Sequence, residues 1–443
     1  MSNLAYKRAR LLALSLVALL ILLGCNQRMG VSWASMSLVT TAQDILVSYE
    51  ERMVLVSRTN GFVVTRDLQG TTTARDSADA WRIDGRDVDA EFYTAPLFFD
   101  YGGERLMLVA DYNSRRLLTI NFNRACFANR VGACVGQDPP FVELSGRVLA
   151  DMGQDESRIY VPLNDEDGVV AYNKGLYEEG WDIEDADERR RRFDETLTVA
   201  WTFETERGVW AQPIALNGTV YIPAMDHRLY RVSAETGEEL ARLELGGALA
   251  SGVVVHDRTP ATDFDDLTGP PEDAEINLET ARLYAGTFGR RIYQIPLDFQ
   301  TGTEDSLPFF EANNWVWGAP KIVDNTLYAA DLGGYVYAID VSDDEFRELW
   351  RVQTEIGGIR ATPLVTENHV IVASREGQVM WLRREDGSTF TQQDVRNEVL
   401  SELMLIPGDE NRETLIIVST VSNSRIMVAF TLEGAPRWTY PSS

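Results

Sequence analysis

Cysteine and histidine are scarce in this 443-residue sequence, which contains three of each. A structural zinc site needs several such ligands at short spacing, and the cysteines are too few to supply them. The three histidines, His227, His256 and His369, stand far apart, and no Ser-His-Asp arrangement can be recognised. The sequence therefore predicts no metal site and no catalytic residues.

Basic residues are also in the minority. Lysine and arginine total 41 against 68 aspartates and glutamates, which gives a formal net charge of −27. This balance argues against nucleic acid as a partner, because proteins bind nucleic acid largely by neutralising phosphates with Lys and Arg. It also provides no electrostatic attraction to an anionic bilayer surface.

An apolar run, Leu11–Leu23, follows the basic residues Lys7, Arg8 and Arg10 near the start of the chain. The run is short for a membrane span and typical of an export signal. It ends in Leu-Leu-Gly-Cys25, which resembles the lipobox of bacterial lipoproteins. That resemblance implies cleavage before Cys25, lipidation of this residue and a mature chain of formal charge −30. The alternative is an uncleaved signal anchor with an incidental cysteine.

The rest of the chain is organised around a repeated unit, most legible at 319–341. There, three short stretches with the period-two alternation of half-buried strands are joined by turns, and the fourth strand is expected at 348–352. The turn 331–334 supplies the glycines that a tight hairpin needs. Eight copies of this hairpin can be recognised, at 54–64, 108–120, 159–172, 220–232, 283–295, 326–340, 370–381 and 416–430.

Units of this kind predict an all-β fold, an eight-bladed β-propeller of four-stranded antiparallel blades. Blades are expected to start near Asp44, Ala95, Arg147, Ala211, Ser251, Ala319, Ala361 and Glu402. The expected organisation is a signal peptide at 1–24, a lipidated tether at 25–43 and the propeller at 44–443. Whether residues 31–39 supply a strand that closes the ring is left open.

Three insertions lengthen the repeats. Residues 173–196 carry acids followed by four arginines and predict a short surface helix, because that order suits the helix dipole. Residues 257–280 are rich in proline and acid and predict a surface loop without the ligand pattern of a calcium site. The third insertion contains Cys126 and Cys134, which are interpreted as a disulfide because an exported domain meets an oxidising compartment.

Tandem strands of this kind, with Thr-Gly or Asp-Gly turns at 236–237 and 386–387, resemble the repeats of pyrroloquinoline-quinone (PQQ)-type propellers. The resemblance covers most of residues 44–443. It implies that outer-strand tryptophans dock neighbouring blades, at Trp81, Trp201, Trp350 and Trp438.

Quinone-dependent members of that family carry a vicinal cysteine pair, a calcium site and a catalytic aspartate, and this chain has no adjacent cysteines. A lipid-anchored member without these residues is similar to the BamB-type lipoprotein scaffold of the outer-membrane β-barrel assembly machinery. The resemblance implies a monomeric, non-enzymatic scaffold without cofactor, binding envelope proteins on the periplasmic side of the outer membrane. Two alternatives remain: a dehydrogenase that uses PQQ and calcium, and an extracytoplasmic sensor or carbohydrate-binding propeller.

Partner contacts are expected from the loops that join one blade's outer strand to the next blade's inner strand. Aromatic residues and arginine dominate interface energetics when a partner buries them. The candidate contact residues in these loops are Tyr93, Trp210, Trp315, Trp317 and Arg360. The alternative for each is packing between blades.

Overall fold

The computed structural model describes most of the chain after residue 91 and separate strands before it. The described residues are 36–38, 44–49, 52–57, 65–66, 72–73, 81–84, 92–101, 104–121, 126–128, 141–165, 168–174, 197–258, 276, 279–408, 410, 413–421, 425 and 427–440. Their regular structure is β-strand, with a single-turn 3₁₀ helix at Glu304–Ser306. A search of the described residues finds no helix with the length and apolar character of a membrane span.

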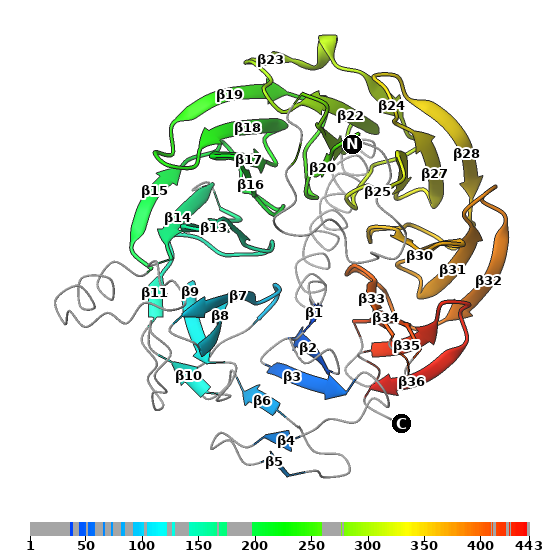
Figure 1. Ribbon diagram of the computed structural model, residues 1–443, viewed down its shortest axis with the longest axis horizontal. Coiled ribbons are helices and arrows are strands. Elements are labelled where there is room, and N and C mark those ends of the chain that lie inside the picture. The colour runs from blue at the N-terminus through cyan, green and yellow to red at the C-terminus, as the bar shows by residue number, and fades with distance from the viewer. Residues whose placement is uncertain are drawn as a thin grey trace, which may run out of the picture.

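The strands form eight sheets, numbered 1 to 8 here in chain order. Figure 1 shows them arranged radially in a ring. Sheets 3, 5, 6, 7 and 8 have four strands each, in chain order and antiparallel. The predicted fold class, an all-β propeller of four-stranded antiparallel blades, is thereby confirmed, and the sheets are compatible with eight blades.

The strands of the first four sheets lie between residues 36 and 303. Sheet 1 contains β1 (Met36–Leu38), β2 (Asp44–Tyr49), β3 (Arg52–Ser57), β4 (Thr65–Arg66), β5 (Thr72–Thr73) and β6 (Trp81–Asp84); sheet 2 contains β7 (Leu97–Tyr101), β8 (Glu104–Asp111), β9 (Arg116–Asn121), β10 (Cys126–Ala128) and β11 (Phe141–Glu143). Sheet 3 contains β12 (Gly153–Gln154), β13 (Arg158–Pro162), β14 (Val169–Asn173) and β15 (Val199–Phe203); sheet 4 contains β16 (Ile214–Leu216), β17 (Thr219–Pro223), β18 (Arg228–Ser233), β19 (Glu239–Glu244) and β23 (Gly302–Thr303).

The last four sheets follow the four-strand pattern throughout. Sheet 5 contains β20 (Val254–His256), β21 (Arg282–Gly286), β22 (Arg291–Pro296) and β24 (Phe309–Glu311); sheet 6 contains β25 (Lys321–Val323), β26 (Thr326–Ala330), β27 (Tyr335–Asp340) and β28 (Arg347–Gln353). Sheet 7 contains β29 (Leu364–Val365), β30 (His369–Ala373), β31 (Gln378–Arg383) and β32 (Thr389–Asp394); sheet 8 contains β33 (Met404–Ile406), β34 (Leu415–Ser419), β35 (Met427–Thr431) and β36 (Pro436–Tyr440).

The predicted hairpins of sheets 2 to 8 coincide with the second and third strands of those sheets. In sheet 1, β3 instead pairs with β6, and the predicted third strand at 62–64 lies outside the described residues. Met36–Leu38, in the segment expected to be a tether, pairs with β2 and so belongs to sheet 1. The predicted signal peptide and most of the insertions at 173–196 and 257–280 also lie outside the described residues.

The hairpin turns share a residue with positive φ just before the third strand. In sheets 6 and 7 it is Gly334 (φ 81°) and Gly377 (φ 82°), whereas in sheets 4 and 5 it is His227 (φ 71°) and Arg290 (φ 62°). This left-handed conformation matches the twist of the two strands and is easiest for glycine.

The core lies between neighbouring sheets, and outer-strand tryptophans hold those sheets together. Trp350 Nε1 of β28 donates a hydrogen bond to the backbone oxygen of Arg384 in sheet 7, at 3.0 Å. Its ring lies against Gly387, where a Cβ would come within 2.7 Å of the indole. Trp201 repeats the arrangement, with its Nε1 2.9 Å from the backbone oxygen of Ala234. Both tryptophans therefore dock adjacent blades as the resemblance implied.

The same position in sheet 4 is Ala241, and an aromatic residue from the next sheet occupies that region instead. Phe299, from the connection between β22 and β24, is buried in one cluster with Ala241 and Tyr221. Its ring lies 6.3 Å from that of Tyr221. The same connection continues into β23, which pairs in parallel with β19 of sheet 4.

A candidate interaction surface

Two sets of loops meet at one end of the sheets. Because neighbouring strands are antiparallel, the turn between the second and third strands lies at the same end as the loop leaving the fourth strand. Tyr93, Trp210, Trp315, Trp317 and Arg360 all lie in loops leaving a fourth strand. The predicted contact residues therefore share this end of the ring, called the turn face below.

Three of them form a stack with a fourth residue, Phe288, from the β21–β22 turn. The Trp315 ring stacks on Phe288 with centroids 5.1 Å apart and planes 14° apart. The Trp317 ring also contacts Phe288, with their centroids 4.9 Å apart. The Arg360 guanidinium carbon lies 3.8 Å from the centroid of the Trp317 ring. We call Phe288, Trp315, Trp317 and Arg360 the aromatic cluster; it links the loops of sheets 5, 6 and 7.

Trp315 is the outermost member of the aromatic cluster, with 48% of its surface exposed. The other three members are partly buried. A large aromatic ring supported from beneath by a second ring loses little conformational freedom when a partner covers it. This arrangement is that of an anchor residue in a protein–protein interface.

A buried carboxylate fixes the loop that carries both tryptophans. Asp331, in the β26–β27 turn, has no exposed surface. Its Oδ2 accepts hydrogen bonds from the backbone N–H of Asn314 at 2.8 Å and from the hydroxyl of Tyr337 at 2.7 Å. Its Oδ1 accepts from the backbone N–H groups of Gly333 and Tyr335. One side chain therefore ties the turn of sheet 6 to the loop arriving from sheet 5.

Backbone hydrogen bonds extend this support to the neighbouring loops. The N–H of Leu332 donates to the oxygen of Trp315 at 2.9 Å, and the N–H of Ile359 donates to the oxygen of Asp331 at 3.1 Å. The N–H of Arg375 donates to the oxygen of Gly358 at 3.0 Å. These bonds therefore connect the turn-face loops of sheets 5, 6 and 7 to one another.

Charge is concentrated beside the aromatic cluster. Burial, and then the positive charge of Arg375, lower the pKa of Arg360 to about 10, while Glu398 acts in the opposite direction. An open pocket of about 570 Å³ adjoins these groups and is lined by Arg375, Glu376, Arg396, Asn397, Glu398 and Val421. The turn face thus presents the aromatic cluster and, on its Arg360 side, a pocket with side chains of both charges.

The other two predicted residues do not join the aromatic cluster. Tyr93 is 8% exposed and packs edge-on against Tyr112, with ring centroids 5.2 Å apart. Trp210 is half-buried in the loop between sheets 3 and 4. Phe288 was missed by the sequence reasoning, although an aromatic residue in a hairpin turn, where polar residues are usual, was a signal.

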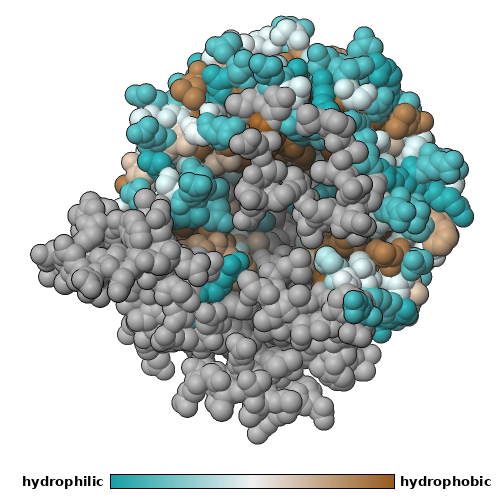
Figure 2. Space-filling view, in the orientation of Figure 1, coloured by the Kyte–Doolittle hydropathy of each residue, from teal (hydrophilic) through white to brown (hydrophobic). Residues whose placement is uncertain are grey.

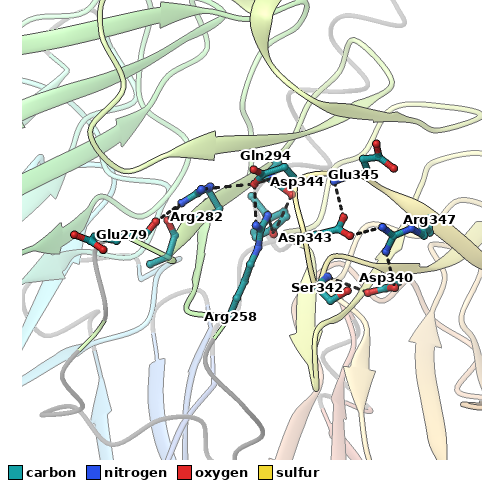
Figure 3. A network of polar contacts seen from close by, with 12 residues as sticks. Arg258, Glu279, Arg282, Gln294, Asp340, Ser342, Asp343, Asp344, Glu345 and Arg347 are labelled. Atoms are coloured by element: carbon teal, nitrogen blue, oxygen red, sulfur yellow. Dashed lines mark hydrogen bonds and ion pairs between the residues drawn. The ribbon is translucent and has the colours of Figure 1, made fainter.

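The opposite end of the ring carries a network of ion pairs between sheets 5 and 6 (Figure 3). Asp344 Oδ1 accepts hydrogen bonds from Arg258 at 2.8 Å and Gln294 at 3.1 Å, and it forms an ion pair with Arg282 at 3.6 Å. Arg258 holds the pKa of the Asp344 carboxyl below its usual range. Because Arg258 and Arg282 belong to sheet 5 and Asp344 to sheet 6, the network joins the two sheets.

Metal ligands and cysteines were the remaining features singled out in the sequence. Within the described residues, no three His, Cys, Asp or Glu side chains gather where they could hold a metal ion. Cys126 is buried and disulfide-bonded. Cys134 and Cys25 lie outside the described residues, so the Cys126–Cys134 pairing and lipidation of Cys25 stay predictions.

Comparison with known proteins agrees with this architecture. Residues 332–443 match the family model for the outer membrane protein assembly factor BamB. The BamB of Salmonella typhimurium is 35% identical over 98 residues, which make up 20% of this chain and 24% of that protein. The chain is similar to BamB and to propellers of PQQ-type repeats. The sequence match spans about a quarter of the length of this curated relative.

Solved structures extend the BamB-like fold over nearly the whole chain. The crystal structure of BamB from Moraxella catarrhalis covers 90% of this chain and 94% of its own, with a TM-score of 0.53 at 12% identity. The computationally designed Ika8 protein covers 91% and 97%, with a TM-score of 0.55 at 10% identity. At these identities the likeness concerns the fold alone.

Proposed function

We propose that this BamB-like propeller is a non-enzymatic scaffold that binds other envelope proteins and takes part in outer-membrane protein assembly. The observation that carries the proposal is the aromatic cluster on the turn face, where an exposed Trp315 rests on Phe288 in loops held by Asp331. A preformed surface of this kind contributes affinity because few side chains must be ordered on binding. The sequence match to an outer membrane protein assembly factor supports the choice of partners.

The partner is expected to cover Trp315 and to reach the pocket on the Arg360 side of the aromatic cluster. Candidates for its contacts are the aromatic cluster first, and Trp210 second, because Tyr93 is largely buried already. The charged side chains that line the pocket suit a partner segment that is itself polar or charged. We propose a monomeric scaffold, since the turn face is then free for a different protein.

The test is capture of envelope partners by the tethered protein in mild detergent, with barrel-assembly components identified by mass spectrometry. The variant Trp315→Ala should reduce their recovery at least about tenfold, as expected for an interface anchor. Phe141→Ala is the matched control, because Phe141 is equally exposed, at 48%, but lies on β11 of sheet 2. Recovery that is unchanged by Trp315→Ala, or absent from the unmodified protein, would contradict the proposal.

Membrane attachment through lipidated Cys25 is part of the same proposal. At about 0.8 kcal/mol per buried methylene, two or three acyl chains hold a folded domain firmly on a bilayer. The unmodified protein should therefore incorporate labelled palmitate and lose residues 1–24, whereas Cys25→Ser should do neither. An unmodified protein that takes up no label and keeps residues 1–24 would favour the uncleaved signal anchor instead. Fractionation of outer and inner membranes tests the location on the outer membrane.

The absence of enzymatic activity is tested separately. Purified protein supplied with calcium and PQQ should give no dye-linked oxidation of alcohols or sugars. Turnover above that of the quinone alone would indicate a quinoprotein dehydrogenase instead of a scaffold. Binding of a sugar, with no protein partner recovered in the capture experiment, would indicate a carbohydrate-binding propeller instead.

A further inference from the structure

The outer edge of sheet 4 carries an added strand. β23 (Gly302–Thr303), from the connection between β22 and β24 of sheet 5, pairs in parallel with β19, with Leu243 opposite Gly302 and Glu244 opposite Thr303. This segment reaches sheet 4 from the next sheet along the chain. The outer edge of a blade in this protein can therefore accept a further strand.

The direction of the backbone groups explains how the added strand is held. The N–H of Leu245 donates to His227 within the sheet, so the N–H groups of Arg242 and Glu244 point outward by alternation. In agreement, the N–H of Arg242 donates to the hydroxyl of Thr301, at 3.3 Å, just before β23. The edge that accepts β23 is thus defined by outward N–H groups at two alternate residues of the outer strand.

The same edge geometry recurs in sheets 6 and 7. Thr354 donates its N–H to Gly334, and Val395 donates its N–H to Gly377, as Leu245 does to His227. By the same alternation, the outward N–H groups are those of Arg351 and Gln353 on β28, and those of Gln392 and Asp394 on β32. Among the described strands, β28 and β32 each have one neighbour, so these edges carry no counterpart of β23.

Each of these three outer strands also exposes an apolar side chain at one equivalent position. A β-bulge interrupts the pairing of the outer strand with its inner neighbour in sheets 4, 6 and 7. The residue left out of the register is Leu240 in sheet 4, Leu349 in sheet 6 and Phe390 in sheet 7. Their exposed fractions are 46%, 56% and 42%, respectively. In Figure 2, hydrophobic patches interrupt the hydrophilic outer surface at the edge of the molecule. A bulge redirects a side chain, and these apolar side chains are left partly exposed on the outer strands. The Phe390 ring also lies 4.5 Å from that of His369 on β30.

We propose that the outer edges of sheets 6 and 7 bind an extended polypeptide segment of a partner, which adds a strand to β28 or β32 as β23 does to β19. Backbone hydrogen bonds at Arg351 and Gln353, or at Gln392 and Asp394, supply the affinity in this mode. The apolar side chains of Leu349 and Phe390 select segments in which apolar and polar residues alternate. This surface is separate from the aromatic cluster and does not depend on the function proposed above.

Fluorescence anisotropy with the purified mature protein tests the proposal. The probe is a labelled ten-residue peptide of alternating valine and threonine with a lysine at each end, and its control is the same peptide with alternate backbone nitrogens methylated. The double variant Gln353→Pro, Gln392→Pro removes one outward N–H from each edge without removing a backbone hydrogen bond inside the sheet. It also removes the side-chain hydrogen bonds from Gln353 to Gly333 and from Gln392 to Gln378. Its control is Gln353→Ala, Gln392→Ala, which removes the same side chains.

Saturable binding of the probe is expected, with the proline variant and the methylated peptide each at least about tenfold weaker and the alanine variant within about twofold. Leu349→Ser with Phe390→Ser should weaken binding about threefold or more. The proposal is overturned by absence of saturable binding, by equal binding of the methylated peptide, or by loss of binding in Trp315→Ala. The methylated peptide keeps the test valid if the proline variant does not fold, because it uses the unmodified protein.

Discussion

At the scale of single residues, two hairpin turns share a positive φ but differ in the space available to a side chain. Gly334 has a φ of 81°, and a Cβ there would lie 2.7 Å from the backbone oxygen of Gly357. Arg290 holds the equivalent conformation with an exposed side chain. Gly334→Ala should therefore lower the free energy of unfolding by about 2 kcal/mol, whereas Arg290→Gly should raise it by about 0.5 kcal/mol. Urea unfolding monitored by tryptophan fluorescence measures both. An increase for Gly334→Ala or a decrease for Arg290→Gly would contradict the role of the turn.

The aromatic cluster shows which site residues a sequence can reveal. Trp315, Trp317 and Arg360 could be selected because they are large residues in loops whose place between blades follows from the repeat. Their mutual stacking could not be predicted, since it depends on Phe288 from another turn and on the hydrogen bonds of Asp331. Tyr93 satisfied the same rule but packs against Tyr112, because loop membership does not report burial.

At the scale of elements, the contact between β28 and sheet 7 is the clearest target for mutation. Trp350→Ala removes a buried indole from its place over Gly387 and should lower the free energy of unfolding by about 3–5 kcal/mol. Trp350→Phe keeps much of the packing but loses the hydrogen bond to Arg384, so a smaller decrease is expected. Thermal denaturation followed by circular dichroism provides the measurement.

Its neighbour in the strand is the control for that change. Leu349 is 56% exposed, and Leu349→Ala should alter the free energy of unfolding by less than about 0.5 kcal/mol. Equal effects of the two alanine substitutions would show that Trp350 does not dock the blades.

Most strands were predictable because a half-buried strand alternates apolar and polar residues and its turn needs a left-handed residue. The strands β26 and β27 occupy the predicted residues. β23 was not predicted, since Gly302–Thr303 has no strand character of its own and pairs with a strand far away in sequence. In sheet 1, a predicted local hairpin gave way to the pairing of β3 with the more distant β6, for which local turn signals carry no information.

At the scale of the whole molecule, buried tyrosines predict the response to alkaline pH. Burial raises the pKa of Tyr172 to about 12, and it also raises that of Tyr221 to about 12. An unfolded tyrosine ionises near pH 10, so the unfolded chain loses these protons first and stability falls as pH rises from about 10 to about 12. Below pH 10 both groups stay neutral in either state and contribute no pH dependence.

Melting temperatures measured across this interval check the alkaline prediction. Tyr172→Phe should show a shallower decline than the unmodified protein between pH 10 and 12, because it removes one of the groups whose ionisation favours unfolding. Tyr112→Phe, at a partly buried position of the β8–β9 turn, is the comparison. A melting temperature that stays constant up to pH 12 would mean that these hydroxyls have the same pKa in the folded and the unfolded protein.

The ring is completed where sheet 8 meets sheet 1, and there the described strands remain with their own sheets. β1 pairs with β2, and β36 pairs with β35, so no described strand crosses this junction. Among the described strands, no main-chain pairing joins sheets 8 and 1, in contrast to the overlap that β23 makes between sheets 4 and 5. Sheets 8 and 1 can consequently separate at this junction without breaking the strand pairing of any described sheet.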